Sequence, residues 1–186
     1  SSMGAEATGT SMSCYNVGKA IALYFSYFLR GRFQNAWIEF NSKAMMHEWK
    51  GKTPLEKWFN DHSGYYGSTN FEGVINLFAQ LKLEGVPEEE FPKGILCISD
   101  YEFDVLSLNK TSVERVHDTL TAAGFSKEYV DNFVICLWNL RNDYYGYNAQ
   151  NRTPFQTYGD VKNVYYMSGY SAQIVSFLNG KVQTTR

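Results

Sequence analysis

The stretch Gly94-Ile95-Leu96-Cys97-Ile98-Ser99-Asp100 holds a continuous apolar run between a glycine and an aspartate. Such a run is typical of a β-strand covered on both faces, as in a parallel sheet. Phe133 to Leu137 is a second run of this kind, and Val164 to Met167 is a third. The three runs predict strands in the interior of one sheet.

Helices are predicted between these strands. Apolar residues recur at helical spacing from Cys14 to Leu29 and from Asn70 to Leu83. A short helix is expected to begin after Thr53, which forms a capping-box pattern with a glutamate three residues later. A helix from Thr111 to Ala123 begins with the same pattern, and Ser171 to Leu178 forms a closing helix.

Strands that alternate with amphipathic helices predict an α/β fold, with a mostly parallel sheet and helices on both faces. We expect Ala36 to Phe40 to belong to this sheet and to form a hairpin with Ala44 to Trp49. Glu88-Glu89-Glu90 is predicted to be a solvated turn, and Asp143 to Lys162 a long loop. We see no domain boundary, so residues 1–186 are expected to form a single domain.

Charge and cysteine usage limit the function classes. The net charge of −2 over 186 residues argues against a nucleic-acid-binding surface spread over the whole molecule. The chain has an odd number of cysteines, Cys14, Cys97 and Cys136, and they lack the spacing of metal ligands. This favours reduced, buried thiols in a cytoplasmic protein. No apolar run reaches the roughly 18 residues of a membrane span.

Polar residues follow the predicted strands at their carboxyl ends, where parallel sheets form their sites. Asp100 ends the first strand, Trp138-Asn139-Leu140-Arg141 the second, and Ser168-Gly169-Tyr170-Ser171 the third. Gly67 to Phe71 adds hydroxyl groups before a helix. Hydroxyls with one carboxylate suit a hard cation such as Mg²⁺. A lone aspartate after a strand can also simply cap the following turn.

A recognition surface for a partner is predicted beside these strand ends. Tyrosines in a polar loop favour contact with another protein, and Arg141 can bind a carboxylate of a ligand or, alternatively, form a structural ion pair. Asp104 is either a supporting acid or a solvated residue. The candidate partner-binding residues are Asp104, Asn139, Arg141, Tyr144, Tyr145 and Tyr147.

Three ordered motifs resemble those of von Willebrand factor A domains. Ser1-Ser2-Met3 resembles the end of their D-x-S-x-S-M motif, Gly67 to Phe71 their second metal loop, and Ile98-Ser99-Asp100 their third. More narrowly, the chain resembles a poorly characterised group of A-domain-like proteins from plants, fungi and viruses. The A domain of the Ro ribonucleoprotein is a more distant likeness. The resemblance implies a Rossmann-like sheet of the A-domain type.

The resemblance also implies a metal-ion-dependent adhesion site. Ser2, Thr69 and Asp100 match its ligands, with Mg²⁺ as the expected cation and a carboxylate of a protein partner in the open coordination position. Such a domain binds proteins and is not an enzyme. A metal-dependent hydrolase would need a general base and further carboxylates, which the pattern does not offer.

The sequence departs from the A-domain pattern at its start. The first Asp and Ser of the D-x-S-x-S motif and the strand before them are absent. In A domains that strand is central, so we expect an N-terminally incomplete domain whose missing first strand comes from an upstream polypeptide or another chain. Alternative functions are a structural subunit of a large assembly such as a virion, without metal, and a Ro-like ribonucleoprotein component that would bind RNA.

Overall fold

The computed structural model describes residues 4, 6–7, 10–40, 43–61, 71–99, 110–140, 155–157, 162–169 and 172–183. The chain divides into two compact units. Unit 1 consists of Ser1, Lys19–Pro92 and Thr111–Asp131, and unit 2 consists of Ser2–Gly18, Lys93–Lys110 and Asn132–Arg186.

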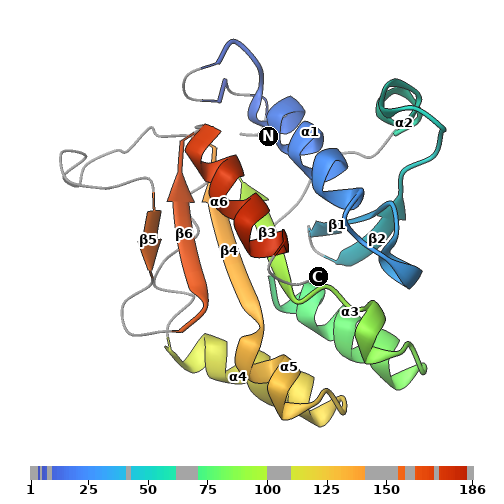
Figure 1. Cartoon of the computed structure of the whole chain (residues 1–186), viewed down its shortest axis with the longest axis vertical. Coiled ribbons are helices and arrows are strands. Elements are labelled where there is room, and N and C mark those ends of the chain that lie inside the picture. The colour runs from blue at the N-terminus through green and yellow to red at the C-terminus, as the bar shows by residue number, and fades with distance from the viewer. Residues whose placement is uncertain are drawn as a thin grey trace. The chain divides into compact units, whose positions relative to one another are not determined.

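Unit 2 contains a four-stranded sheet in the order β3-β4-β6-β5 (Figure 1). Strands β3 (Gly94–Ser99), β4 (Val134–Asn139) and β6 (Val164–Ser168) are parallel, and β5 (Phe155–Thr157) is antiparallel to β6. The three apolar runs of the sequence therefore form neighbouring parallel strands, as predicted. The α/β class is confirmed.

Strand β4 is deeply buried in this sheet. Its residues from Ile135 to Asn139 are all buried, and the Trp138 side chain is fully enclosed. Helix α6 (Ala172–Gln183) lies across one face of the sheet in Figure 1. The Phe177 ring lies 5.4 Å from the Tyr165 ring of β6, and this contact fixes the helix to the sheet.

Gly94 at the start of β3 permits a close approach of two backbones. A Cβ atom at this position would overlap the carbonyl oxygen and side chain of Val134 on β4. The glycine that bounds the apolar run in the sequence therefore has a steric role in pairing β3 with β4.

Unit 1 is mainly helical, with one hairpin. Helix α3 (Phe71–Leu83) contacts both strands of the hairpin. The other elements with residues in this unit are α1 (Cys14–Ser26, which begins in unit 2), η2 (Gly31–Phe33), β1 (Ala36–Phe40), β2 (Ala44–Glu48), α2 (Pro54–Asn60), η3 (Glu88–Glu90), α4 (Lys110–Ala122, whose first residue belongs to unit 2) and α5 (Lys127–Asn132).

The predicted hairpin is confirmed, but the prediction that Ala36 to Phe40 joins the parallel sheet is wrong for the part of the chain that the structure describes. Strand β1 pairs only with β2, antiparallel, in a separate two-stranded sheet. The backbone of β1 is paired in this local hairpin. The strand also carries Glu39, whose charge suits an edge strand rather than the interior of a sheet.

A chain of aromatic rings forms the core of unit 1. Phe91 lies 5.0 Å from Phe33, 5.7 Å from Phe78 and 4.8 Å from Phe125, measured between ring centroids. The Phe125 ring in turn stacks on Tyr129 at 4.5 Å. These five rings come from different elements or connections. They therefore link η2, α3, the end of η3 and the start of α5.

Several helix boundaries differ from those predicted. Helix α1 ends at Ser26 rather than Leu29, where the Ser26 hydroxyl donates to the Leu23 carbonyl at 2.7 Å. Helix α4 begins at Lys110, so Thr111 lies inside it rather than capping it. Helix α6 continues past Gly180.

The short elements η2, α5 and β5 were not predicted from the sequence. Strand β5 occupies residues 155–157, inside the stretch predicted to be a loop. The capping box of α2 is confirmed, with the Glu56 amide donating to the Thr53 hydroxyl at 3.1 Å. None of the helices in the described ranges is long and apolar enough to cross a membrane.

Candidate functional site

A row of polar residues lies across the carboxyl ends of the three parallel strands of unit 2. Ser99, the last residue of β3, is in register with Asn139, the last residue of β4. Asn139 is in turn in register with Ser168, the last residue of β6. The strand ends selected from the sequence are therefore adjacent, and we call Ser99, Asn139 and Ser168 the carboxyl-edge row.

Backbone hydrogen bonds hold the chain where it leaves this row. The Leu140 amide donates to the Ser99 carbonyl, and the Gly169 amide donates to the Asn139 carbonyl, each at 2.8 Å. The Trp138 indole N–H donates to the Gly169 carbonyl at 2.7 Å. Gly169 has φ = 74°, a left-handed conformation that favours glycine. The exits of β4 and β6 are thus fixed against their neighbours.

Two members of the row are interior groups. Ser99 is 8% exposed and Asn139 is 4% exposed. Buried hydroxyl and amide groups are stable only when they are hydrogen-bonded. Asn139 was predicted to contact a partner, and this role stays a prediction for a residue that is buried in the structure.

The other predicted site residues lie outside the described residues. These are the metal-ligand candidates Ser2, Thr69 and Asp100 and the partner-binding candidates Asp104, Arg141, Tyr144, Tyr145 and Tyr147. Within the described ranges, no group of three or more His, Cys, Asp or Glu side chains could hold a metal ion. The three cysteines are buried and form no disulfide, as expected from the sequence, and burial raises the pKa of the Cys97 thiol above its ordinary value.

Unit 1 contains a half-buried ion pair that sequence reasoning did not find. The Lys19 Nζ atom lies 3.0 Å from Asp61 Oδ2 and donates to the Trp58 carbonyl at 2.9 Å. It also lies over the Trp58 ring, 4.7 Å from its centroid. These contacts join α1 to the end of α2, and their role is structural.

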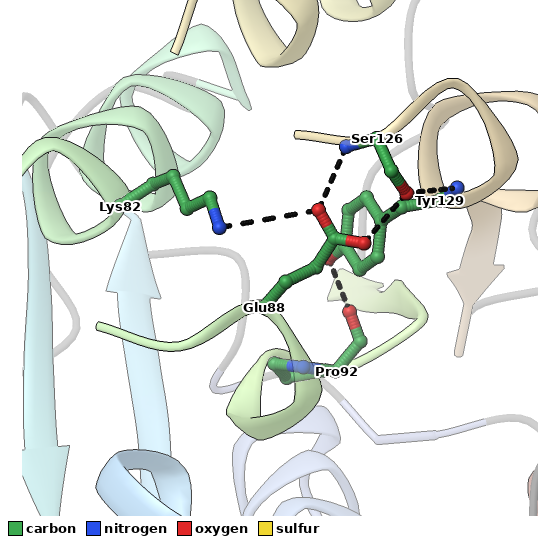
Figure 2. A network of polar contacts seen from close by, with 5 residues as sticks. All are labelled: Lys82, Glu88, Pro92, Ser126 and Tyr129. Carbon is green, nitrogen blue, oxygen red and sulfur yellow. Dashed lines mark hydrogen bonds and ion pairs between the residues drawn. The ribbon is translucent and has the colours of Figure 1, made fainter. Parts of the chain in front are cut away.

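A second polar network in unit 1 is centred on Glu88 (Figure 2). One carboxylate oxygen of Glu88 accepts from the Ser126 amide at 2.7 Å, and the other accepts from the Ser126 hydroxyl at 2.6 Å. The Ser126 hydroxyl oxygen also accepts from the Tyr129 amide at 3.1 Å, which caps α5. The Tyr129 hydroxyl donates to the Pro92 carbonyl at 2.6 Å.

No residue of η3 is buried, in agreement with the prediction of a solvated turn, but the Glu88 carboxylate is also bound by Ser126. Burial opposes the charged form of Glu88, but the hydrogen bonds from Ser126 and the positive charge of Lys82 outweigh burial and lower the pKa of the carboxyl. Burial, followed by the negative charge of Glu88, raises the pKa of Tyr129. Both groups keep their usual protonation state at neutral pH, and the network is a helix cap rather than an acid–base site.

Replacing Glu88 by glutamine should change how stability depends on pH. The pKa of Glu88 is lower in the folded state than the unfolded value of about 4.3. Its stabilisation is therefore complete above that unfolded value and is lost as pH falls through the folded pKa. We expect Glu88→Gln to cost about 1 kcal/mol at pH 7 and less at pH 3.

Urea unfolding at both pH values measures this difference. Glu89→Gln is the matched control, because Glu89 is an exposed neighbour of Glu88 in η3. A Glu88→Gln protein that loses the same free energy of unfolding at pH 3 and pH 7 would show that the charge of Glu88 does not stabilise the cap.

Comparison with known proteins places the whole chain in one family. A search of curated proteins and a search of solved structures each found no match. The resemblance to von Willebrand factor A domains and to the Ro protein therefore stays a prediction. A family model matches residues 1–185, and its description is "Domain of unknown function (DUF7788)". The chain belongs to the DUF7788 family.

Proposed function

We propose that this chain is a protein-binding module, and that its partner contacts the carboxyl edge of the sheet in unit 2 through a divalent cation. The observation that carries the proposal is the carboxyl-edge row, in which the ends of β3, β4 and β6 lie in register. Sites of open parallel sheets form at this edge. The Rossmann-like, A-domain type of sheet is part of the same proposal.

The residue types of the carboxyl-edge row suit a hard cation in part. Serine hydroxyls and an asparagine carbonyl are oxygen groups of the kind that Mg²⁺ accepts directly or through water. A cation of charge +2 also needs a carboxylate close by. Asp100 supplies one in the sequence, since it directly follows Ser99. In this proposal Asp100 is the charged ligand, and Ser2 and Thr69 are the neutral ligands.

The role of the cation is to bind rather than to react. Mg²⁺ keeps some of its coordination positions for water, and a carboxylate of the partner replaces one such water. The backbone hydrogen bonds at the ends of β4 and β6 support this role, because a hydrogen-bonded edge loses little conformational entropy when a partner binds.

Removing the cation should dissociate the native complex. The native protein, purified in the presence of Mg²⁺, should show by light scattering a mass that falls when EDTA is added. The mass should recover when Mg²⁺ is restored in excess. A native mass that is the same with and without EDTA contradicts the proposal and favours a structural subunit that assembles without metal.

A further inference from the structure

Helix α2 has the reverse of the usual arrangement of a surface helix. Its lysine, Lys57, is only 5% exposed, whereas its apolar residues Leu55 and Phe59 are 66% and 68% exposed. A helix on the surface of a soluble protein normally buries its large apolar side chains and exposes its lysines. Leu55 and Phe59 are four positions apart, so they lie on the same face of the helix. The outward face of α2 is therefore apolar.

Contacts within unit 1 fix α2 in this orientation. The Lys57 Nζ atom donates to Asn35 Oδ1 at 2.6 Å and lies 4.2 Å from the centroid of the Tyr27 ring. At the end of the helix, the Asn60 side chain donates to the Lys50 carbonyl at 3.0 Å. Rotating the helix to bury its apolar face would break these contacts. The outward direction of that face therefore follows from the packing of unit 1.

Two exposed lysines lie beside this apolar face. Lys52 comes just before the start of α2, and Lys50 is bonded through its carbonyl to the end of the helix. Within the described ranges, no ion pair engages either lysine side chain. The carboxylate of Glu56, the one acid of α2, accepts from backbone amides at the start of the helix. We call Leu55, Phe59, Lys50 and Lys52 the α2 surface, which is apolar and positively charged.

The end of helix α3 carries an exposed surface of the opposite charge. Leu83 falls outside the buried stripe of α3 and is 73% exposed, and the exposed Glu84 follows it. The helix η3, which contains the exposed Glu89, lies beside this end, where Lys82 Nζ is 3.9 Å from Glu88 Oε2 (Figure 2). In the part of the chain that the structure describes, no ion pair engages Glu84 or Glu89. We call Leu83, Glu84 and Glu89 the α3 surface.

The two surfaces complement each other but do not meet within one chain. Leu55, Phe59 and Leu83 are the three most exposed large apolar residues of the described chain, and all belong to unit 1. Figure 1 shows α2 and α3 apart from each other. Only a second copy of the chain can therefore bring an α3 surface onto an α2 surface. Contact between two like surfaces would set lysine against lysine or glutamate against glutamate, which opposes association.

We propose that copies of this chain associate with one another, with the α2 surface of one copy on the α3 surface of another. The apolar side chains pack at the centre of the contact, and the lysines pair with the glutamates around it. The surfaces are small compared with the roughly 800 Å² per partner of a stable interface. Association is therefore weak, and it depends on protein concentration and on salt. It uses no residue of the carboxyl-edge row and no cation.

Sedimentation equilibrium of the full chain in EDTA tests this association apart from any cation. At low salt the average mass should rise above that of the monomer as protein concentration increases, and added salt should lower it again. Phe59→Ala should weaken the association by about tenfold or more. Met45→Ala is the control, because Met45 is an exposed apolar residue of unit 1 that belongs to neither surface. A chain that stays monomeric at every concentration would overturn the proposal.

Charge reversal identifies the two surfaces. One variant, Lys50→Glu with Lys52→Glu, makes both surfaces negative, and the other, Glu84→Lys with Glu89→Lys, makes both positive. Each variant alone should stay monomeric, because like charges repel. An equimolar mixture of the two should associate as the unmodified chain does, since each negative surface meets a positive one. An unchanged urea midpoint confirms that each variant is folded. A mixture that stays monomeric, or a variant that associates alone, contradicts the proposal.

Isotope-filtered NMR on a mixture of labelled and unlabelled chains identifies what covers the α2 surface. We expect contacts between the Phe59 ring of one copy and the Leu83 methyl groups of another. Contacts of the Phe59 ring with its own chain alone would show that the surface is covered internally. A chain that stays monomeric but binds vesicles of anionic lipid would show a membrane-binding surface instead. Either result would overturn the proposal.

Discussion

Replacing Phe91 by alanine should lower the free energy of unfolding by about 3–5 kcal/mol. Phe91 is 4% exposed and contacts the rings of Phe33, Phe78 and Phe125. Removing the ring costs the transfer free energy of its apolar surface and also leaves a cavity among three aromatic neighbours. The loss is large compared with a total stability of about 5–15 kcal/mol.

Phe59→Ala is the matched control for this experiment. Phe59 is the same residue type in the same unit, but it is 68% exposed. Its replacement should change the free energy of unfolding by less than about 0.5 kcal/mol. Urea denaturation followed by tryptophan fluorescence measures both variants. Equal losses for Phe91→Ala and Phe59→Ala would show that the aromatic chain is not the core of unit 1.

Replacing Asp100 by alanine should weaken Mg²⁺ binding by about 100-fold, which corresponds to about 3 kcal/mol. Asp100 is the only charged ligand among the three residues proposed for the cation, and a dication loses most of its attraction to the site without it. Thr69→Ala, which removes a neutral ligand, should weaken binding less. Calorimetric titration with MgCl₂ measures both affinities.

Asp118→Ala is the control for the loss of an aspartate. Asp118 is an exposed residue of α4 in unit 1 and is not among the proposed ligands, and its removal changes the net charge equally. Its affinity for Mg²⁺ should equal that of the unmodified protein. If Asp100→Ala and Asp118→Ala bind Mg²⁺ equally well, Asp100 is not a ligand.

The sequence predicted the parallel sheet of unit 2 because each of its three parallel strands can be recognised from its own residues. Continuous apolar runs around Ile95, Ile135 and Val164 need cover on both faces, and such runs pair side by side in parallel sheets. The register of Ser99, Asn139 and Ser168 follows from that, since parallel strands end at the same edge. The candidate edge was therefore predictable from strand ends alone.

Pairing at longer range was less predictable. The backbone of strand β1 pairs in a local hairpin, and the charge of Glu39 was a weak signal that β1 lies outside the parallel sheet. The three residues of β5 are too few to give an alternation pattern. Glu88 looks like part of a solvated acidic turn because its partner, Ser126, is 38 residues away. For β5 and Glu88 the deciding contact is tertiary and leaves no local pattern.

The position of a bound cation tests the central claim most directly. Mn²⁺, a paramagnetic substitute for Mg²⁺, broadens the NMR signals of nearby amides, and the effect falls steeply with distance. The amides of Ser99, Leu140 and Gly169 lie at the carboxyl edge, whereas those of Gly94 and Val134 lie at the opposite ends of their strands, about 17 Å away. We predict that substoichiometric Mn²⁺ broadens the first three signals before the other two, and that Asp100→Ala abolishes this selectivity. Broadening that is absent, or that begins at Gly94 and Val134, would contradict a cation site at the carboxyl edge.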